Sequence, residues 1–401
     1  MDTTKTQQNI PSGWKFGELG NFLTDIGDGG TPSRLKAEYF GGEIPWVVVN
    51  DIQPHIRKTK DTLTDVGLKR SSAKLWPIGS VILSFGATIG EVGIADVPVT
   101  TKQGIAGIIP SDDLINSYLY YLLLSKKHLL HKLSSGSTIK EVRPSVIKKQ
   151  IEVLVPPIKE QQKIAEILGT VDEDIAKIQE VIEATEKLKR GLMHELLTGQ
   201  IINSTWESKR LEEVATISRG GSPRPIESYL TDDSDGLNWL RIGDIDVADK
   251  YIYRTTDKIK REGLKKTTQV QIGDLILSNS MSFGRPYIMK IDACIHDGWL
   301  AFKNISKEIK TEYLYYILSS DKTQSTFYSL AMGSGVKNLK RESVSSIEIK
   351  FPEIDEQNKI LAILSSVDEK ISINKKLKEK LILFKKGLMQ DLLSGNKRVK
   401  I

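Results

Sequence analysis

The chain repeats itself, and this repeat constrains the fold more than any other feature of the sequence. Residues 160–199 align with residues 356–395 without a gap, at an offset of 196, and 18 of the 40 positions are identical. Near the end of each segment the repeat reads "GLMHELLTG" and "GLMQDLLSG". A repeat of this length indicates that the chain consists of two copies of one structural unit.

Weaker matches extend the repeat upstream in the same order, with offsets between 191 and 197. Three pairs are "GGTPS" (29–33) with "GGSPR" (220–224), "GSVILS" (79–84) with "GDLILS" (273–278), and "SYLYYLLLS" (117–125) with "EYLYYILSS" (312–320). Each half therefore contains a variable block followed by a better-matched block. We expect residues 1–157 and 201–354 to form the two variable domains, and 158–200 and 355–401 to form the two repeated segments.

The repeated segments predict long helices, because their apolar residues recur at steps of three and four. Such steps make a narrow apolar seam, which is typical of a coiled coil. We expect the two helices to pack antiparallel, since a globular block separates them in the chain. The seam positions are Val171, Ile175, Ile178, Ile182, Leu188, Leu192 and Leu196 in the first helix, and Val367, Ile371, Asn374, Leu381, Phe384, Leu388 and Leu392 in the second.

Three details of these helices have specific interpretations. Gly169-Thr170 and Ser365-Ser366 predict a break one-third of the way along each helix. Asn374 is either a buried polar residue that fixes the register or a residue at a solvated edge. The last three seam positions of each helix are buried between the helices or against partner subunits, and both interpretations remain open.

The variable blocks predict an α+β fold. Short runs rich in β-branched residues, such as "PWVVVNDI" (45–52) and "GSVILSFG" (79–86), lie between turns that contain Gly, Asp and Pro. The segments 117–133 and 312–328 each predict one largely buried helix. "IKKQIEVLVPP" (147–157) and "VSSIEIKFPEI" (344–354) predict strands that close each block. The expected architecture is two similar globular heads separated by two long antiparallel helices, with pseudo-two-fold symmetry.

Composition limits the class of protein. The chain has 401 residues, a net charge of +6 and a pI near 9.0, which weakly favours an anionic partner. The single cysteine, Cys294, indicates a reducing compartment. The first residues lack the apolar stretch of a signal peptide, and no apolar run reaches the ~18 residues that span a bilayer. We therefore expect a cytoplasmic protein without membrane contact.

Two-fold symmetric dimers read two identical half-sites on a DNA duplex. Two similar but non-identical heads would likewise suit the reading of two different half-sites. The helices are retained between the two copies, whereas the heads have diverged. This contrast indicates that the heads vary with their target and that the helices serve a constant partner.

At this point the residues resemble a known family. The sets Glu160-Gln161, Val171-Asp172 and Gly191-Leu192-Met193, with their copies Glu356-Gln357, Val367-Asp368 and Gly387-Leu388-Met389, are similar to the conserved helical regions of type I restriction–modification specificity subunits. "GGTPSR" and "GSTIKEV" resemble segments of that family's target-recognition domains. The resemblance covers essentially the whole chain, in the order recognition domain, helix, recognition domain, helix.

The resemblance implies a specificity subunit that reads double-stranded DNA and has no catalytic activity of its own. In the family, two modification subunits dock on the helices and methylate adenine N6 with S-adenosylmethionine. Restriction subunits, which use ATP and Mg²⁺, join to cut unmodified DNA. The helices would then set the spacing between the half-sites, and the cofactors would belong to the partner subunits.

The sequence motifs agree with this division of labour. Pro156-Pro157 is not part of an amino-methyltransferase motif, and "GATIGEVG" lacks the Gly-Lys-Ser/Thr of a phosphate loop. Five histidines and one cysteine offer no zinc spacing. Glu348 and Lys350 have the spacing of a nuclease motif but lack its upstream partner. We therefore assign no catalytic or metal-binding residue. The alternatives are a self-contained DNA methyltransferase or nuclease, and a DNA-binding regulator outside restriction.

Residues that read DNA should be hydrogen-bond donors on irregular loops, supported by glycine-rich backbone that can approach phosphates. In the first head the candidates are Thr31, Ser33, Arg34, Thr88, Lys102, Gln103, Ser137, Thr138 and Lys140. In the second head they are Ser222, Arg224, Arg241, Ser280, Ser282, Arg285, His296, Ser334 and Lys337. The alternative for each is an ordinary solvated side chain. Trp46 and Trp239, and the tyrosines of the two "YLYY" segments, predict core positions instead.

Overall fold

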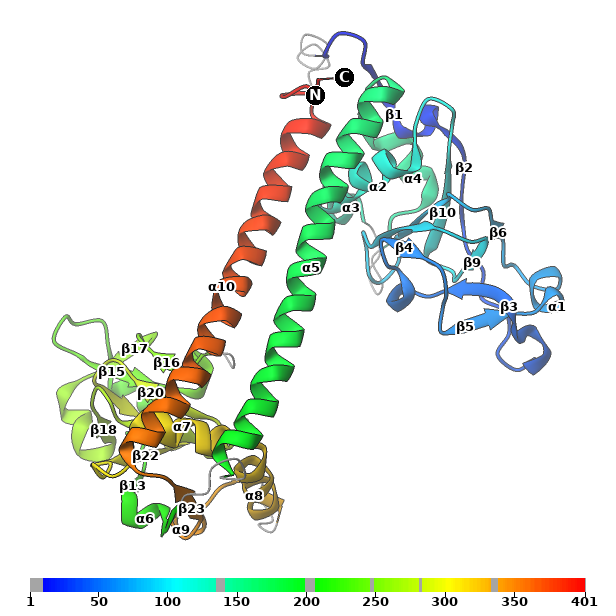
Figure 1. Ribbon diagram of the computed structural model, residues 1–401. Coiled ribbons are helices and arrows are strands. Elements are labelled where there is room, and N and C mark those ends of the chain that lie inside the picture. The colour runs from blue at the N-terminus through cyan, green and yellow to red at the C-terminus, as the bar shows by residue number, and fades with distance from the viewer. Residues whose placement is uncertain are drawn as a thin grey trace. The chain divides into compact units, whose positions relative to one another are not determined.

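The computed structural model describes residues 10–134, 141–198, 206–245, 249–280, 283–332 and 338–400. The chain divides into two compact units. Unit 1 comprises Met1–Gln179 and Lys376–Ile401, and unit 2 comprises Glu180–Lys375. Each unit holds one head and part of each of two long helices, α5 (Ile158–Leu197) and α10 (Ile354–Leu393) (Figure 1).

Head one, residues 10–157, contains two sheets and a strand pair. The first sheet has the order β2-β10-β7-β8-β4 and the second has the order β5-β3-β9-β6, while β1 pairs with β11. The strands are β1 (Lys15–Glu18), β2 (Leu23–Asp28), β3 (Phe40–Val47), β4 (His55–Ile56), β5 (Asp61–Leu63), β6 (Leu75–Trp76), β7 (Val81–Ser84), β8 (Val92–Ala95), β9 (Val99–Thr101), β10 (Ile105–Pro110) and β11 (Glu152–Val155).

Head two, residues 206–353, repeats this topology with one additional strand, β14, at the edge of its second sheet. Its sheets have the orders β13-β22-β19-β20-β16 and β14-β17-β15-β21-β18, and β12 pairs with β23. The strands are β12 (Glu207–Arg210), β13 (Thr216–Arg219), β14 (Leu230–Thr231), β15 (Leu237–Leu240), β16 (Tyr251–Ile252), β17 (Asp257–Ile259), β18 (Thr268–Val270), β19 (Leu275–Ser278), β20 (Pro286–Met289), β21 (Ala293–Ile295), β22 (Trp299–Lys303) and β23 (Glu348–Phe351). The predicted α+β fold and its duplication are confirmed.

Short helices complete each head. They are α1 (Asp65–Lys69), α2 (Asn116–Ser125), α3 (Lys127–Leu133) and α4 (Pro144–Gln150) in head one, and α6 (Leu211–Val214), α7 (Thr311–Ser319), α8 (Asp321–Met332) and α9 (Arg341–Ser345) in head two. Two sequence predictions are wrong here. The single helices expected at 117–133 and 312–328 are each split in two. The first residues of the strands expected at 147–157 and 344–354 belong to α4 and α9.

Serine hydroxyls occur at both splits. Ser125 donates from Oγ to the carbonyl of Leu122, and Ser320 donates to the carbonyl of Ile317, at 2.6 and 2.7 Å. Such local side-chain bonds compete with continuation of the helix.

The predicted core positions are confirmed. Trp46 and Trp239 are 1% and 0% exposed, and Tyr118 and Tyr313 are fully buried. They belong to the buried core with the other large apolar side chains, and burial of an aromatic residue contributes strongly to stability.

The long helices are continuous, so the predicted breaks at Gly169-Thr170 and Ser365-Ser366 are wrong. Both α5 and α10 run for 40 residues. Thr170 donates from Oγ1 to the carbonyl of Glu166, four residues earlier, and Ser365 donates to the carbonyl of Leu361 in the same way. Each hydroxyl is thus satisfied within its own helix, which these residues tolerate in a helix interior.

Within each unit the two helices are antiparallel, as predicted. In unit 1, Asp172 of α5 pairs with Lys385 of α10, and Gln179 accepts a hydrogen bond from Lys378. In unit 2, Lys189 pairs with Asp368, and Glu186 pairs with Lys375. As the residue number of the α5 partner increases, that of the α10 partner decreases, which is the pattern of antiparallel helices.

The helix ends that carry the repeated "GLM" motif pack into the head of their own unit. Leu392 and Leu393 belong to the core of head one, together with Tyr118. Met193 belongs to the core of head two, together with Tyr313. Each repeated helix end therefore packs against a head of the same fold. This equivalent packing within the chain explains why the two helix ends have similar sequences. No helix of the described residues is long and apolar enough to span a membrane.

Candidate nucleic-acid interface and the junctions that support it

The identical Glu-Gln pairs of the repeat lie where each long helix leaves its head. The side chain of Gln161 is fully buried and accepts a hydrogen bond from the backbone N–H of Ile115 at 2.9 Å. Its amide donates to the carbonyls of Asp113 and Pro156 at 2.7 and 2.8 Å. One buried amide therefore satisfies three backbone groups that no secondary structure pairs.

Gln357 makes the same three contacts in head two. It accepts from the N–H of Lys310 at 2.9 Å and donates to the carbonyls of Glu308 and Pro352 at 2.7 and 2.8 Å. The preceding glutamates are also equivalent. Trp14 donates from its indole to Glu160 at 3.0 Å, and Trp206 donates to Glu356 at 3.2 Å.

An aspartate joins head and helices in unit 1. Tyr121 of α2 donates from its hydroxyl to Oδ2 of Asp172 at 2.9 Å, and Nζ of Lys385 lies 2.6 Å from Oδ1. The ammonium of Lys385 is also 5.2 Å from the centre of the Tyr121 ring. Arg398 adds a bidentate contact to Glu160, with both distances 2.8 Å. We call these residues, with Trp14 and Gln161, junction one.

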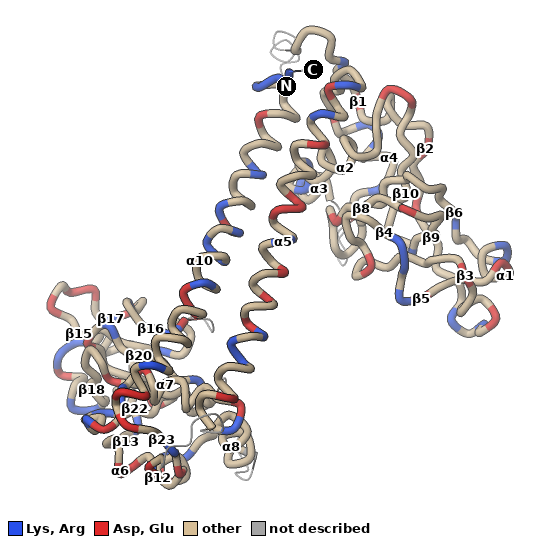
Figure 2. The backbone as a smooth tube through the Cα atoms, in the orientation of Figure 1, with Lys and Arg blue, Asp and Glu red and all other residues tan. Residues whose placement is uncertain are grey.

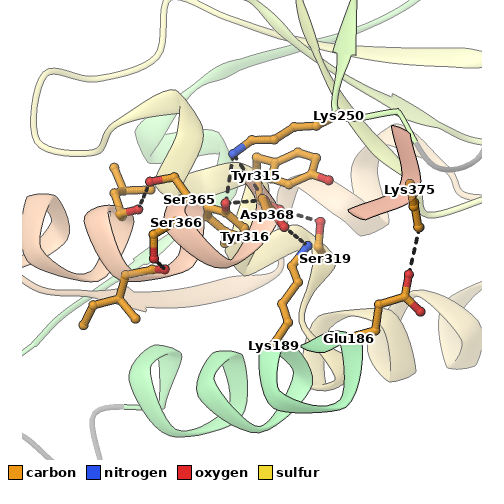
Figure 3. A network of polar contacts seen from close by, with 12 residues as sticks. Glu186, Lys189, Lys250, Tyr315, Tyr316, Ser319, Ser365, Ser366, Asp368 and Lys375 are labelled. Carbon is orange, nitrogen blue, oxygen red and sulfur yellow. Dashed lines mark hydrogen bonds and ion pairs between the residues drawn. The ribbon is translucent and has the colours of Figure 1, made fainter. Parts of the chain in front are cut away.

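The same arrangement recurs in unit 2 (Figure 3). Tyr316 of α7 donates to Oδ2 of Asp368 at 2.6 Å, and Nζ of Lys189 lies 2.6 Å from Oδ1. Lys250, from head two, reaches this cluster as well. Its Nζ is 3.0 Å from the Tyr316 hydroxyl, 3.9 Å from Asp368 and 4.2 Å from the centre of the Tyr316 ring. We call these residues, with Trp206, Glu356 and Gln357, junction two.

Burial controls the protonation of these groups. Burial and the adjacent carboxylates raise the pKa of Tyr121 and of Tyr316, so both hydroxyls remain neutral donors. Burial lowers the pKa of Lys250, against the opposing attraction of Asp368. The junctions are therefore hydrogen-bonded networks built from repeated residues, and they hold each head on the long helices of its unit.

Backbone hydrogen bonds gather the candidate DNA-reading loops of head one. The N–H of Gly30 donates to the carbonyl of Thr101 at 2.9 Å. The N–H groups of Phe85 and Gly86 donate to the carbonyl of Gly104 at 2.9 and 3.0 Å. These bonds bring together the loops that carry Thr31, Ser33, Arg34, Thr88, Lys102 and Gln103.

Head two gathers its loops in the same way. The N–H of Gly221 donates to the carbonyl of Ile295 at 3.1 Å, and the N–H of Asn279 donates to the carbonyl of Gly298 at 2.9 Å. The N–H of His296 donates to the carbonyl of Leu240 at 3.2 Å, next to Arg241. The loops that carry Ser222, Arg224, Arg241, Ser280 and His296 therefore meet at one place.

The paired glycines of these loops serve packing within the chain. A Cβ on Gly29 would lie 2.1 Å from the carbonyl oxygen of Thr101, and one on Gly220 would lie 2.1 Å from the carbonyl oxygen of His296. Only glycine permits this approach of two backbones. The sequence interpretation that the glycines make room for phosphates is therefore not needed to explain them.

The candidate arginines differ in how they are held. Arg34 pairs with Asp61 at 2.6 Å and stacks 5.0 Å from the centre of the Phe40 ring. Arg241 pairs with Asp257 at 2.5 Å. The backbone N–H of Arg285 donates to Oγ of Ser278 at 3.0 Å. Six further candidates lie outside the described residues: Ser137, Thr138, Lys140, Ser282, Ser334 and Lys337.

The sequence analysis overlooked two aspartates in these loops. Asp28 accepts from the N–H groups of Gly29 and Gly104, both at 2.8 Å, and burial raises its pKa. Asp297 accepts from Ser222 at 3.0 Å and lies 2.8 Å from His296. The predicted candidates are mainly hydrogen-bond donors, whereas these two side chains are acceptors. Asp28, which directly precedes Gly29-Gly30, is the one that its place in the sequence could have marked. Lys and Arg are interspersed with Asp and Glu over both heads (Figure 2), so charge alone does not mark the interface.

The predicted helix seam is partly buried and partly exposed. Val171, Ile182, Ile371 and Leu392 are buried, whereas Ile175, Ile178, Leu192, Leu196, Val367, Leu381 and Leu388 are half-buried. Leu188 and Phe384 are 55% and 56% exposed, so they are not buried between the helices. Asn374 donates to the carbonyl of Lys370 in its own helix at 2.8 Å, a bond that does not connect the two helices.

Exposed apolar side chains occur at equivalent positions of the two helices. Leu188 and Phe384 are related by the offset of 196, and so are Val181 and Leu377, which are 42% and 43% exposed. Equivalent exposure in the two units marks two similar apolar surfaces. Among the described residues, no group of three His, Cys, Asp or Glu side chains could hold a metal ion.

Comparison with known proteins places the chain among specificity subunits. The MjaVIII specificity subunit of Methanocaldococcus jannaschii is 24% identical over 98% of this chain and 94% of that protein. The MjaIX specificity subunit of the same organism is 31% identical, but the chain spans only 56% of its length. The EcoKI specificity subunit of Escherichia coli K12 is 22% identical over 88% of this chain and 81% of that protein.

Solved structures share the fold. An S subunit of a type I restriction-modification system from M. genitalium superposes with a TM-score of 0.59 at 18% identity, covering 97% of each chain. A chain from a study of complex assembly in the type I R-M system superposes with a TM-score of 0.66 at 17% identity, covering 97% of this chain and all of that one.

The family model of the type I restriction modification DNA specificity domain matches twice, over residues 11–186 and 203–382. The two matches fall on the two halves of the internal repeat. The chain belongs to the family of type I restriction–modification specificity subunits and contains two copies of its DNA specificity domain.

Proposed function

We propose that the chain is the non-catalytic DNA-recognition subunit of a type I restriction–modification complex, in which each head reads one half of an asymmetric bipartite site. The observation that carries this proposal is the contrast between junctions and loops. The two heads share the same basic topology and the Trp, Glu, Gln, Tyr and Asp residues of the junctions, whereas their gathered loops present different side chains. Two heads that are supported alike but carry different loops suit the reading of two different DNA sequences.

The long helices would set the spacing between the half-sites and dock two modification subunits. The equivalent exposed pairs Leu188/Phe384 and Val181/Leu377 support this role. Apolar side chains exposed on both units offer the same surface twice, and apolar anchors of this kind are typical of interface cores. One copy of the same partner can therefore bind each unit.

Catalysis would belong to the partners. The modification subunits would use S-adenosylmethionine to methylate adenine N6, and the restriction subunits would use ATP and Mg²⁺. The complex would act on DNA in the cytoplasm. The chain would contribute binding and orientation, which bring a target adenine to the methyltransferase.

The test compares the isolated chain with the chain mixed with its modification subunits, using labelled S-adenosylmethionine and DNA that carries random sequence. We expect methylation only in the mixture, at a bipartite sequence. The double variant Leu188→Asp and Phe384→Asp should lose the partner and the activity, because it places charges in an apolar contact. The matched control Lys187→Ala, an exposed neighbour, should keep both. Methylation by the isolated chain would refute the proposal.

A further inference from the structure

One carboxylate lies at the centre of the gathered loops of head two. Oδ1 of Asp297 accepts a hydrogen bond from Ser222 Oγ at 3.0 Å and lies 2.8 Å from Nε2 of His296. The backbone carbonyl of Asp297 accepts from Nε of Arg219 and from the amide of Asn279, both at 3.1 Å. These contacts fix both the backbone and the side chain of Asp297, which is 32% exposed.

Arg224 extends from this carboxylate into solvent. Its Nη2 lies 3.5 Å from Oδ2 of Asp297, and its side chain is 81% exposed. A guanidinium has five N–H donors, so a single contact at its base leaves most of them available. Asp297 therefore contacts an arginine whose side chain remains largely accessible to solvent.

Head one has a different side chain at the equivalent place. The N–H of Lys102 donates to the carbonyl of Val47, as that of His296 does to Leu240. Phe85 N–H donates to Gly104, as Asn279 N–H does to Gly298. The residue between these two contacts is Gln103 in head one and Asp297 in head two. An amide in one head thus corresponds to a carboxylate in the other.

The chemistry of base edges distinguishes these side chains. In the major groove, arginine donates to both O6 and N7 of guanine, an acidic side chain accepts from N4 of cytosine, and glutamine forms two hydrogen bonds with adenine. An arginine and an aspartate that touch each other can therefore read the two bases of one G·C pair.

We propose that Arg224 and Asp297 together read one G·C base pair in the half-site of head two, and that Gln103 reads an adenine in the half-site of head one. This inference rests on the proposed function. A phosphate contact explains the arrangement less well, because a carboxylate beside the arginine weakens its attraction for an anion. The same carboxylate adds an acceptor that a base edge can use.

The experiment measures base preference with the complete complex of chain and modification subunits, on DNA in which each half-site is randomised. The variants are Arg224→Lys, Arg224→Ala and Asp297→Asn. Each should reduce the preference for G·C at one position of one half-site by roughly tenfold or more, and should leave the other half-site unchanged. Gln103→Ala should relax an A·T position of the other half-site.

A matched control lies in the same head. Arg261 is also an exposed arginine beside an aspartate, with Nε 3.6 Å from Asp235, and its side chain is 68% exposed. Arg261 does not belong to the gathered loops. Arg261→Ala should therefore leave the base preference of both half-sites unchanged.

The outcomes separate the inference from the proposed function. If Arg224→Lys keeps the base preference, Arg224 contacts phosphate and the inference fails. If the half-site of head two contains no G·C pair, the inference also fails. Asp297→Asn keeps the size of the side chain, so it tests the pair even if Arg224 variants do not fold. If the unaltered complex shows no sequence preference at all, the proposed function itself fails.

Discussion

Junction one and junction two repeat the same chemistry but differ in one added cation. Both contain a tyrosine hydroxyl and a lysine on one aspartate, Asp172 in unit 1 and Asp368 in unit 2. In junction one the added cation is Arg398, which lies on Glu160. In junction two it is Lys250, which lies on Tyr316 and Asp368.

The sequence accounts for this difference. The N–H of Ile288 donates to the carbonyl of Lys250, as the N–H of Ile94 donates to that of Pro54, so the position of Lys250 is occupied by proline in head one. The repeat partner of Arg398 is Ile202, which cannot supply a charge and lies outside the described residues. The comparison teaches that the shared aspartate network is the common support of a head, and that each unit has added a cation of its own.

The largest expected effect follows from removing the shared aspartates. Asp172→Ala leaves the Tyr121 hydroxyl and the mostly buried ammonium of Lys385 without a hydrogen-bond partner. Asp368→Ala removes the partner of the Lys189 ammonium and the acceptor of the Tyr316 hydroxyl, which keeps only its contact with Lys250. We expect each variant to lower the free energy of unfolding of its own unit by about 3 kcal/mol. Hydrogen exchange read by mass spectrometry can assign the loss to unit 1 or unit 2.

The matched control for these variants is Asp174→Ala, an exposed aspartate on α5. This variant should leave the free energy of unfolding of both units unchanged. Equal destabilisation of both units by Asp368→Ala would contradict the view that each aspartate supports only its own head.

An intermediate effect is expected from the tyrosines. Tyr121→Phe and Tyr316→Phe each remove a hydrogen bond that a hydroxyl donates to a carboxylate, and Tyr316→Phe also removes an acceptor of Lys250. Each variant should cost about 1.5 kcal/mol at neutral pH. Chemical denaturation of each variant at pH 7 measures this cost. A cost near zero for both would show that the hydroxyls do not support the heads.

The tyrosines also predict a pH dependence. The folded protein holds the pKa of Tyr316 above the ordinary value of 10.0, so above pH 10 the unfolded chain loses this proton while the folded chain keeps it. Stability from this group is complete below pH 10 and falls by up to about 1.4 kcal/mol per pH unit above it. The advantage of the unaltered protein over Tyr316→Phe should therefore shrink between pH 10 and pH 11. An unchanged difference would contradict this linkage.

The smallest expected effect concerns the added cation of junction two. Lys250→Met removes a hydrogen bond and a contact with the ring of Tyr316, but it also removes the cost of burying an ammonium, which lowers the pKa of Lys250. The two effects nearly offset, so we expect a change within about 1 kcal/mol. Lys189→Met, which removes the closer cation on Asp368, should cost more in the same denaturation assay. If Lys250→Met lowers the free energy of unfolding more than Lys189→Met does, Lys250 contributes more to stability than Lys189, which would contradict this prediction.

The sequence predicted the duplication, the α+β heads and the antiparallel helices, because hydrophobic period and internal repeat can be recognised without knowledge of tertiary contacts. It predicted the helix interiors wrongly at Gly169-Thr170 and Ser365-Ser366, since the hydroxyls there bond within the helix and do not cap it. The splits at Lys126 and Ser320 were missed as well, because the apolar pattern does not register the local hydrogen bonds of the Ser125 and Ser320 hydroxyls.

The junctions show why a repeat alone does not reveal a role. Gln161 and Asp172 were identified only as repeated residues, and their partners Ile115 and Tyr121 lie about 50 positions away in the sequence. Such contacts depend on the tertiary fold. The contacts of Asp297 depend on the fold in the same way, since its neighbours Ser222 and Arg219 lie 75 and 78 residues earlier in the sequence.

In the proposed function, the two heads read two different half-sites and the junctions only support the heads. The most direct test replaces head two with a second copy of head one, keeps α5, α10 and the modification subunits, and sequences the methylated DNA. We predict that the second half-site disappears and that the first is read twice. Methylation at the original asymmetric site by this chimera would contradict the account.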